Sequence, residues 1–194
     1  MPGGSFSPAS ARGLLSALLL GASSIPASSE AVTFADLAGM LIDADIHRSQ
    51  DVRRDGKSFS IQAHQNWKIA VGADRTIDLT VNTTVNGPRG TQKAPPNAGR
   101  FTLDESRSVQ SRGGGQGAWS FADGTLSFIR TFPSGAYRAH FEFSRSDAGI
   151  TCKVTEAFAR EVGANAITLE SPFGGQVTII NSNQLSSTCQ TKSP

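Results

Sequence analysis

From Met40 onward, hydrophobic and polar residues alternate with a period of two, which is typical of β-strands that bury one face. Asp-Gly pairs and other turn signals interrupt this alternation at short intervals. The pattern predicts nine or ten strands, at about residues 40–54, 57–72, 75–86, 99–110, 117–122, 125–132, 136–145, 149–160, 166–171 and 176–181. Nearly all of the connections have hairpin length, so we expect an antiparallel up-and-down meander.

The turns also predict which residues face one another. Asp55-Gly56 is interpreted as a two-residue type I′ turn, which sets Val52 opposite Phe59. The segment "GADRT" that follows the second strand sets Trp67 opposite Val81. The apolar faces of these strands agree over their whole length, as a sheet with one buried face requires.

The aromatic stretch "GAWSFADGTLSFIRTF" follows the same rule, with a turn at Asp123-Gly124. We expect the next two hairpins to turn at Ser134-Gly135 and at Asp147-Ala148. The cross-strand pairs predicted in this way are Trp119 with Phe128, Phe128 with Phe141, and Phe143 with Cys152. These rings fall on one inner face, where they would line a core or a cavity.

The predicted fold class is all-β, an antiparallel meander of about eight to ten strands that closes into a soluble barrel, with a two-sheet sandwich as the alternative. The outward residues of the second strand are polar, which excludes an outer-membrane barrel. One helical turn is expected at residues 33–38, where Thr33 and Asp36 resemble a capping pair. The Gly- and Pro-rich segment Asn86–Gly99 is predicted to be a long connection, either a lid or a floppy edge.

The N-terminus has the pattern of a secretory signal peptide. Arg12 precedes the apolar run Leu14–Ala22, and small residues follow it. Cleavage is expected after Ala31, with Ala27 as the second choice. We therefore expect a periplasmic or secreted protein whose mature part, residues 32–194, is one β-barrel domain.

Two cysteines, Cys152 and Cys189, remain in this exported chain, and an even number in an oxidising compartment predicts a disulfide. No histidine or carboxylate lies at a spacing that would complete a metal site with them. The net charge is only +2, and the one tight basic cluster is Arg53-Arg54 with Lys57 at a turn. We therefore expect no nucleic-acid binding. No segment after the N-terminal run is apolar enough for a membrane helix, so we expect no membrane insertion either.

Leu37-Ala38-Gly39 directly before the first strand, followed by a meander, resembles the calycin layout of lipocalins and avidins. The resemblance is one of layout and covers most of the mature chain. Leu41 stands where lipocalins carry a tryptophan two residues after the glycine. The chain is also similar to uncharacterised exported bacterial proteins, from which no activity is carried over.

Several polar residues interrupt the apolar inner face, and a buried charge costs several kcal/mol unless it is paired. They are Arg48, Gln50, Gln65, Arg130, Glu156 and Arg160. The expected registers place Arg130 beside Ala139, and Ala139 beside Glu156. The sequence therefore predicts an Arg130–Glu156 ion pair across the floor of the barrel.

This pair admits three interpretations. In the first, the pair is structural, or its residues lie at a barrel rim and reach water. In the second, Arg130 orients an anionic or carbonyl group of a ligand. In the third, Glu156 is an acid/base catalyst. In the second case the predicted ligand-binding residues are Arg130, Glu156, Trp67, Phe128, Tyr137, Phe158 and Gln65. No second catalytic group lies near Glu156. The histidines His47, His64 and His140 all point outward, so no metal, cofactor or histidine catalysis is expected.

The leading functional hypothesis is therefore non-enzymatic binding of a small, apolar or amphipathic ligand inside the barrel. The alternative is an envelope protein-interaction module or inhibitor that acts through segment Asn86–Gly99 and the Arg53-Arg54 turn. The third is an enzyme on an unfamiliar template. The three differ in whether the barrel is hollow, whether the loops bind a partner, and whether a second group titrates near Glu156.

Overall fold

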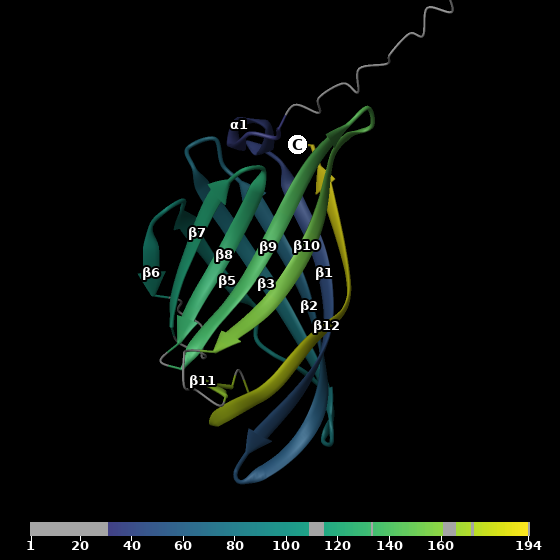
Figure 1. Cartoon of the computed structure of the whole chain (residues 1–194), viewed down its shortest axis with the longest axis vertical. Coiled ribbons are helices and arrows are strands. Elements are labelled where there is room, and N and C mark those ends of the chain that lie inside the picture. Colours follow the sequence, from purple (N-terminus) through teal and green to yellow (C-terminus); the bar gives the residue numbers. More distant parts are fainter. Residues whose placement is uncertain (1–30, 109–114, 133, 161–165, 172, 194) are drawn as a thin grey trace, which may run out of the picture.

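The protein is built from two antiparallel sheets and one short helix, which confirms the predicted all-β fold class (Figure 1). The computed structural model describes residues 31–108, 115–132, 134–160, 166–171 and 173–193. The signal-peptide prediction therefore falls outside the described residues. No helix in the described ranges is long and apolar enough to cross a membrane.

The first sheet has seven strands, in the order β11-β12-β1-β2-β3-β4, with β5 also paired to β3. Their bounds are β1 (Leu41–Arg54), β2 (Lys57–Val71), β3 (Thr76–Gly87), β4 (Gly90–Lys93), β5 (Asn97–Thr102), β11 (Ile167–Glu170) and β12 (Gln176–Lys192). The second sheet has the order β10-β9-β8-β7-β6. Its strands are β6 (Ser106–Ser108), β7 (Gln116–Ala122), β8 (Thr125–Phe132), β9 (Gly135–Ser146) and β10 (Gly149–Arg160).

The two sheets face each other, with α1 (Phe34–Leu37) at one end and the β1–β2 hairpin and β11 at the other (Figure 1). The predicted capping pair is present, since the Thr33 backbone N–H donates to Asp36 Oδ2 over 2.8 Å. This bond, with the Arg145 guanidinium 2.8 Å from Asp36 Oδ1, lowers the pKa of Asp36 to about 2. Arg145 therefore ties α1 to β9.

Four of the five predicted hairpin registers are confirmed, three of them in the pairs β1–β2, β2–β3 and β7–β8. β1 pairs with β2 from Arg54 opposite Lys57 onward, and the β2–β3 register has Trp67 opposite Val81. Trp119 lies opposite Phe128 in the β7–β8 hairpin. Both Asp-Gly turns have positive φ at their two residues, 51° and 75° in the first and 47° and 70° in the second, as a type I′ turn requires.

The predicted β8–β9 register is wrong by two residues. Phe132 pairs with Gly135, so the turn begins one residue earlier than expected, and Phe128 lies opposite Ala139 instead of Phe141. A shift of two leaves every side chain on the same face. The alternation of apolar residues therefore could not distinguish the two registers. The β9–β10 register, with Phe143 opposite Cys152, is as predicted.

Three segment boundaries also differ from the prediction. The last strand continues to Lys192, well beyond residue 181, and pairs with β1 as far as Leu41. The predicted strand 99–110 is divided between the two sheets, as β5 and β6, with Leu103 bridged in parallel to Trp119. Segment Asn86–Gly99 is not a plain loop, because it contains β4 and the start of β5.

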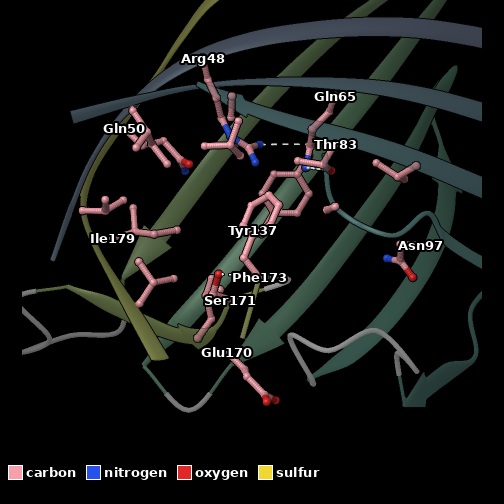
Figure 2. Close-up of a pocket in the computed structure, with 18 of the residues that line it drawn as sticks. Arg48, Gln50, Gln65, Thr83, Asn97, Tyr137, Glu170, Ser171, Phe173 and Ile179 are labelled. Carbon is pink, nitrogen blue, oxygen red and sulfur yellow. Dashed lines mark hydrogen bonds between the residues drawn. The ribbon is translucent and has the colours of Figure 1, made fainter. Parts of the chain in front are cut away.

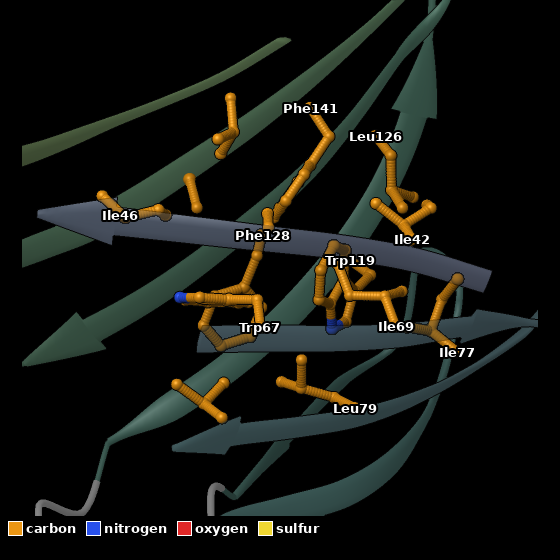
Figure 3. Close-up of a cluster of buried hydrophobic side chains, with 14 of the residues drawn as sticks. Ile42, Ile46, Trp67, Ile69, Ile77, Leu79, Trp119, Leu126, Phe128 and Phe141 are labelled. Atoms are coloured by element: carbon orange, nitrogen blue, oxygen red, sulfur yellow. The ribbon is translucent and has the colours of Figure 1, made fainter. Parts of the chain in front are cut away.

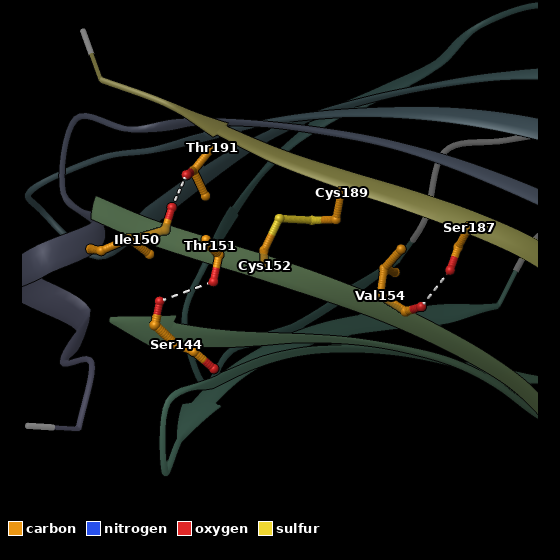
Figure 4. The surroundings of a disulfide bond; sticks show 8 residues. All are labelled: Ser144, Ile150, Thr151, Cys152, Val154, Ser187, Cys189 and Thr191. Atoms are coloured by element: carbon orange, nitrogen blue, oxygen red, sulfur yellow. Dashed lines mark hydrogen bonds between the residues drawn. A yellow bond between two sulfur atoms is a disulfide. The ribbon is translucent and has the colours of Figure 1, made fainter. Parts of the chain in front are cut away.

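The sheets also meet along a seam between β10 and β12, where no backbone ladder links the described strands. The predicted Cys152–Cys189 disulfide is present in this seam, with the two Cα atoms 5.4 Å apart (Figure 4). Ser187 Oγ donates to the Val154 carbonyl over 2.9 Å, and the Thr191 hydroxyl donates to the Ile150 carbonyl. Side chains of β12 thus satisfy backbone groups of β10 that a ladder would otherwise pair.

A cluster of buried hydrophobic side chains occupies the half of the barrel next to α1, and Figure 3 shows part of it. Leu37 of α1 is fully buried over this end. The rings of Trp67 and Trp119 meet edge to face with centroids 6.4 Å apart. The other large, fully buried side chains of this region include Ile42, Ile46, Ile69, Ile77, Leu126 and Phe141.

Removal of the disulfide by Cys152→Ser with Cys189→Ser should lower the free energy of unfolding by about 3–4 kcal/mol, because the bond closes a 37-residue loop in the unfolded chain. Urea unfolding of oxidised wild type and of the double variant measures this difference. A loss below about 1 kcal/mol would show that the seam's hydrogen bonds alone hold β10 to β12.

Candidate functional site

The half of the barrel away from α1 contains a cavity of about 360 Å³. It opens at the end that carries the β1–β2 hairpin and β11, where the lining residues Pro95, Pro96 and Glu170 are exposed to solvent. Figure 2 shows Arg48 and Gln65 at one end of the cavity and Ser171 and Glu170 at the other. The volume is that of a small-ligand site.

The cavity begins where the inner face of β1 changes from apolar to polar. Ile42, Ala44 and Ile46 are buried in the packed half, whereas Arg48 and Gln50, further along the same face, line the cavity. Polar side chains cannot interdigitate like aliphatic ones without losing hydrogen bonds. The change of residue type along a single strand therefore marks the boundary between core and cavity.

A network of four polar side chains forms the inner end of the cavity. Arg48 Nη1 lies 3.0 Å from both carboxylate oxygens of Glu156 and 3.2 Å from Gln65 Oε1. The Tyr137 hydroxyl donates to Glu156 Oε1 over 2.5 Å. Gln65 Oε1 also accepts from Trp67 Nε1 over 3.2 Å. Side chains from β1, β2, β9 and β10 are thereby joined in one network.

The ion pair in this network is buried. The Arg48 and Glu156 side chains are 9% and 3% exposed. The Arg48 guanidinium carbon lies 5.3 Å from the Phe158 ring centroid, close enough for a cation–π contact. Arg48 Nε is the atom of this pair that has no hydrogen-bond partner among the described residues.

Burial and the nearby Glu156 carboxylate raise the pKa of Tyr137 well above its usual value. The phenol therefore stays protonated at neutral pH and serves as a donor to Glu156. Glu156 in turn accepts from Arg48 and Tyr137, and its backbone N–H donates to Gln184 Oε1 over 2.7 Å. The network is internally satisfied apart from Arg48 Nε.

The predicted Arg130–Glu156 pair is corrected by this geometry, because the partner of Glu156 is Arg48. The shifted β8–β9 register places Arg130 opposite Tyr137, whereas Ala139 lies opposite Phe128. Arg48 belongs to the other sheet and reaches Glu156 across the barrel. No register within a sheet could have revealed that contact.

Most of the other predicted site residues do line the cavity, which places them together without testing their role. They are Trp67, Phe128, Tyr137, Phe158, Gln65 and Arg130. Glu156 is not among the lining residues, but it accepts hydrogen bonds from two of them, Arg48 and Tyr137. Gln50 also lines it and donates to Ser182 Oγ over 3.2 Å. The side chain of Arg160 falls outside the described residues.

Arg130 is half-buried in the cavity wall, and its guanidinium carbon lies 5.2 Å from the Phe132 ring centroid. Desolvation lowers the pKa of Arg130 to about 10. The side chain therefore still carries its positive charge at neutral pH. A dehydrated cation in an apolar wall is a suitable partner for a ligand oxygen.

Sequence reasoning missed part of the cavity rim. The segment from Ala94 to Asn97 forms one wall, and the Ala94 N–H donates to the Thr83 carbonyl over 2.9 Å. Ser171 and Phe173, beyond β11, line another part. Neither segment shows the regular alternation of hydrophobic and polar residues on which the strand prediction relied. Thr83 could have been found, because it shares the inner parity of Val81 on β3.

The three histidines lie on outward-facing positions. His47 and His64 stack on each other with ring centroids 4.3 Å apart, and His64 Nε2 lies 2.7 Å from Asp45 Oδ1. His140 Nδ1 lies 2.9 Å from the Ser127 hydroxyl. None of the three is among the residues that line the cavity.

Comparison with known protein families, curated proteins and solved structures finds no match for this chain. The calycin resemblance therefore stays a prediction. What the cavity does has to be inferred from its shape and chemistry.

Replacement of Glu156 by Gln should lower the free energy of unfolding by about 3–5 kcal/mol, because it leaves Arg48 as a buried, uncompensated cation. The matched control is Asp78→Asn, which breaks the exposed Arg100–Asp78 pair and should cost less than about 1 kcal/mol. Urea unfolding measures both. Equal losses in the two variants would show that the buried Arg48–Glu156 pair contributes no more to stability than an exposed pair.

Tyr137 is the sole tyrosine, so the absorbance of tyrosinate reports on it alone. Because its folded pKa is raised, the unfolded chain loses this proton first, near pH 10. The contribution of Tyr137 to stability is therefore complete below pH 10 and falls as the pH rises above it. The folded protein should show no tyrosinate near pH 10, where a urea-unfolded sample is half-ionised. Ionisation of Tyr137 near pH 10 in the folded protein would contradict the buried network.

Proposed function

We propose that this protein binds, without chemical alteration, a small and partly apolar molecule that carries an anionic or carbonyl group. The observation that carries the proposal is the cavity of about 360 Å³ inside the barrel. Ligand sites in proteins are mostly apolar, with a few placed polar groups that fix orientation. Phe128, Phe158 and Trp67 supply apolar wall here, and Arg130 supplies charge.

Arg130 is the side chain that we propose to hold the polar group of the ligand. Its guanidinium is half-buried in the cavity lining and still charged at neutral pH. Gln50, Gln65 and Thr83 present amide and hydroxyl groups to the same space. A carboxylate or carbonyl near Arg130 would therefore meet a charge-assisted donor with neutral polar groups around it.

The network around Glu156 supports binding more than catalysis. A general base must reach the proton that it removes, and its pKa must suit that task. Both oxygens of Glu156 accept from Arg48, and Oε1 also accepts from Tyr137. We therefore assign Glu156 to holding the cavity wall in place.

We also infer that the protein works in an oxidising compartment outside the cytoplasm. The support is the Cys152–Cys189 disulfide together with the signal-peptide pattern of the N-terminus. An interaction module that acts through segment Asn86–Gly99 stays the alternative prediction. Pro95 and Pro96 of that segment belong to the cavity wall, which favours the ligand hypothesis.

Arg130→Ala should weaken binding of anilinonaphthalene sulfonate, an anionic aromatic probe, by about tenfold or more, because it removes one charge-assisted hydrogen bond. Decanoate should displace the probe from wild type. Arg138→Ala, an exposed cation that faces outward on β9, is the matched control and should bind normally. Circular dichroism checks that both variants fold.

Equal affinities of the Arg130 and Arg138 variants would contradict the assigned role of Arg130. A wild-type protein that binds neither probe would contradict the proposed function as a whole. Trp67 lines the cavity and Trp119 lies in the packed core. Fluorescence of a Trp119→Phe variant therefore reports directly on the cavity wall.

A further inference from the structure

Charge is separated along the long axis of the molecule, although the net charge of the chain is only +2. The cavity end comprises residues 51–59, 84–97, 129–132, 134–138 and 166–171, with 173–178. It carries seven basic and three acidic side chains. Arg54 and Arg130 line the cavity, and the other five are exposed at this end, namely Arg53, Lys57, Arg89, Lys93 and Arg138.

The opposite end has the reverse balance. Its segments are residues 33–45, 66–80, 98–105, 118–127, 140–153 and 187–193, which together carry ten acidic and six basic side chains. Arg75, Arg100 and Arg145 among these are paired with carboxylates of the same end. The barrel is therefore an electrostatic dipole whose positive end is the end where the cavity opens.

Some apolar groups also reach the surface at the mouth. Pro95 and Pro96 are exposed, and Phe59 and Phe173 are half-buried, all four in the lining of the cavity. The β1–β2 hairpin, which carries Arg53 and Lys57, extends beyond the second sheet at this end (Figure 1). A flat surface that met this end would contact basic side chains around an apolar opening.

We infer that this end of the barrel docks on an anionic lipid bilayer, with the cavity mouth facing the headgroups. Each basic side chain close to such a surface strengthens binding about fivefold. A nucleic acid or an acidic protein would meet the same charges but would have no use for an apolar opening. The choice of a bilayer rests on the proposed function, because it takes the cavity to hold an amphipathic ligand.

Sedimentation with vesicles tests this docking on the folded, disulfide-intact protein. Vesicles of phosphatidylcholine with about 30% phosphatidylglycerol should pellet the protein, and vesicles of phosphatidylcholine alone should not. About 0.5 M NaCl, which shortens the screening length to a few ångströms, should release it. Equal pelleting with both kinds of vesicle would overturn the inference.

A charge reversal at the mouth, Arg53→Glu with Lys57→Glu, should weaken pelleting by about a hundredfold or more, because it changes the charge near the surface by four. The matched control reverses two exposed lysines of the opposite end, Lys68→Glu with Lys153→Glu. It should pellet as wild type does. Equal weakening of both variants would show only a net-charge effect and would overturn the inference.

The probe experiment separates this inference from the proposed function. The Arg53 and Lys57 variant should still bind anilinonaphthalene sulfonate, because the cavity wall around Arg130 is intact. Pelleting without any probe binding would support docking and contradict the cavity ligand. Probe binding without pelleting would overturn docking and leave the proposed function standing.

Discussion

The architecture depends on one buried ion pair, between Arg48 of β1 and Glu156 of β10. The two strands are not hydrogen-bonded neighbours, since β12 lies between them and no ladder joins β12 to β10. The pair costs desolvation energy, which Tyr137 and Gln65 offset with additional hydrogen bonds. The position of the pair across the seam explains why charged groups are found deep inside the barrel at all.

The same polar layer divides the barrel into a core half and a cavity half. On one side of it, buried aromatic and aliphatic side chains pack against one another under α1. On the other side, β1 continues past the second sheet, and space remains between the walls (Figures 1 and 2). The network at the inner end joins side chains of four strands, which suits the ligand-binding role proposed for the cavity.

Much of the fold follows from local rules, and the failures have a common cause. The two Asp-Gly turns determine the β1–β2 and β7–β8 registers, because a type I′ turn allows one pairing. The β2–β3 and β9–β10 registers follow from other short turns together with the rule that apolar faces agree. The β8–β9 register was predicted wrongly, because a shift of two residues leaves every side chain on the same face and the alternation cannot detect it. The C-terminal half of β12 was not predicted, because it lacks the alternation of apolar residues. Its Ser187 and Thr191 hydroxyls donate to carbonyl groups of β10 instead. Arg48 was not predicted as the partner of Glu156, because it belongs to the other sheet.

Native mass spectrometry of the protein, purified gently from the organism that makes it, tests the central claim that the cavity holds a ligand. The account predicts a discrete additional mass on the folded chain, consistent with a molecule that fits about 360 Å³, and predicts that mild heating removes it. A bare chain mass under the same gentle conditions, with the disulfide intact, would contradict it.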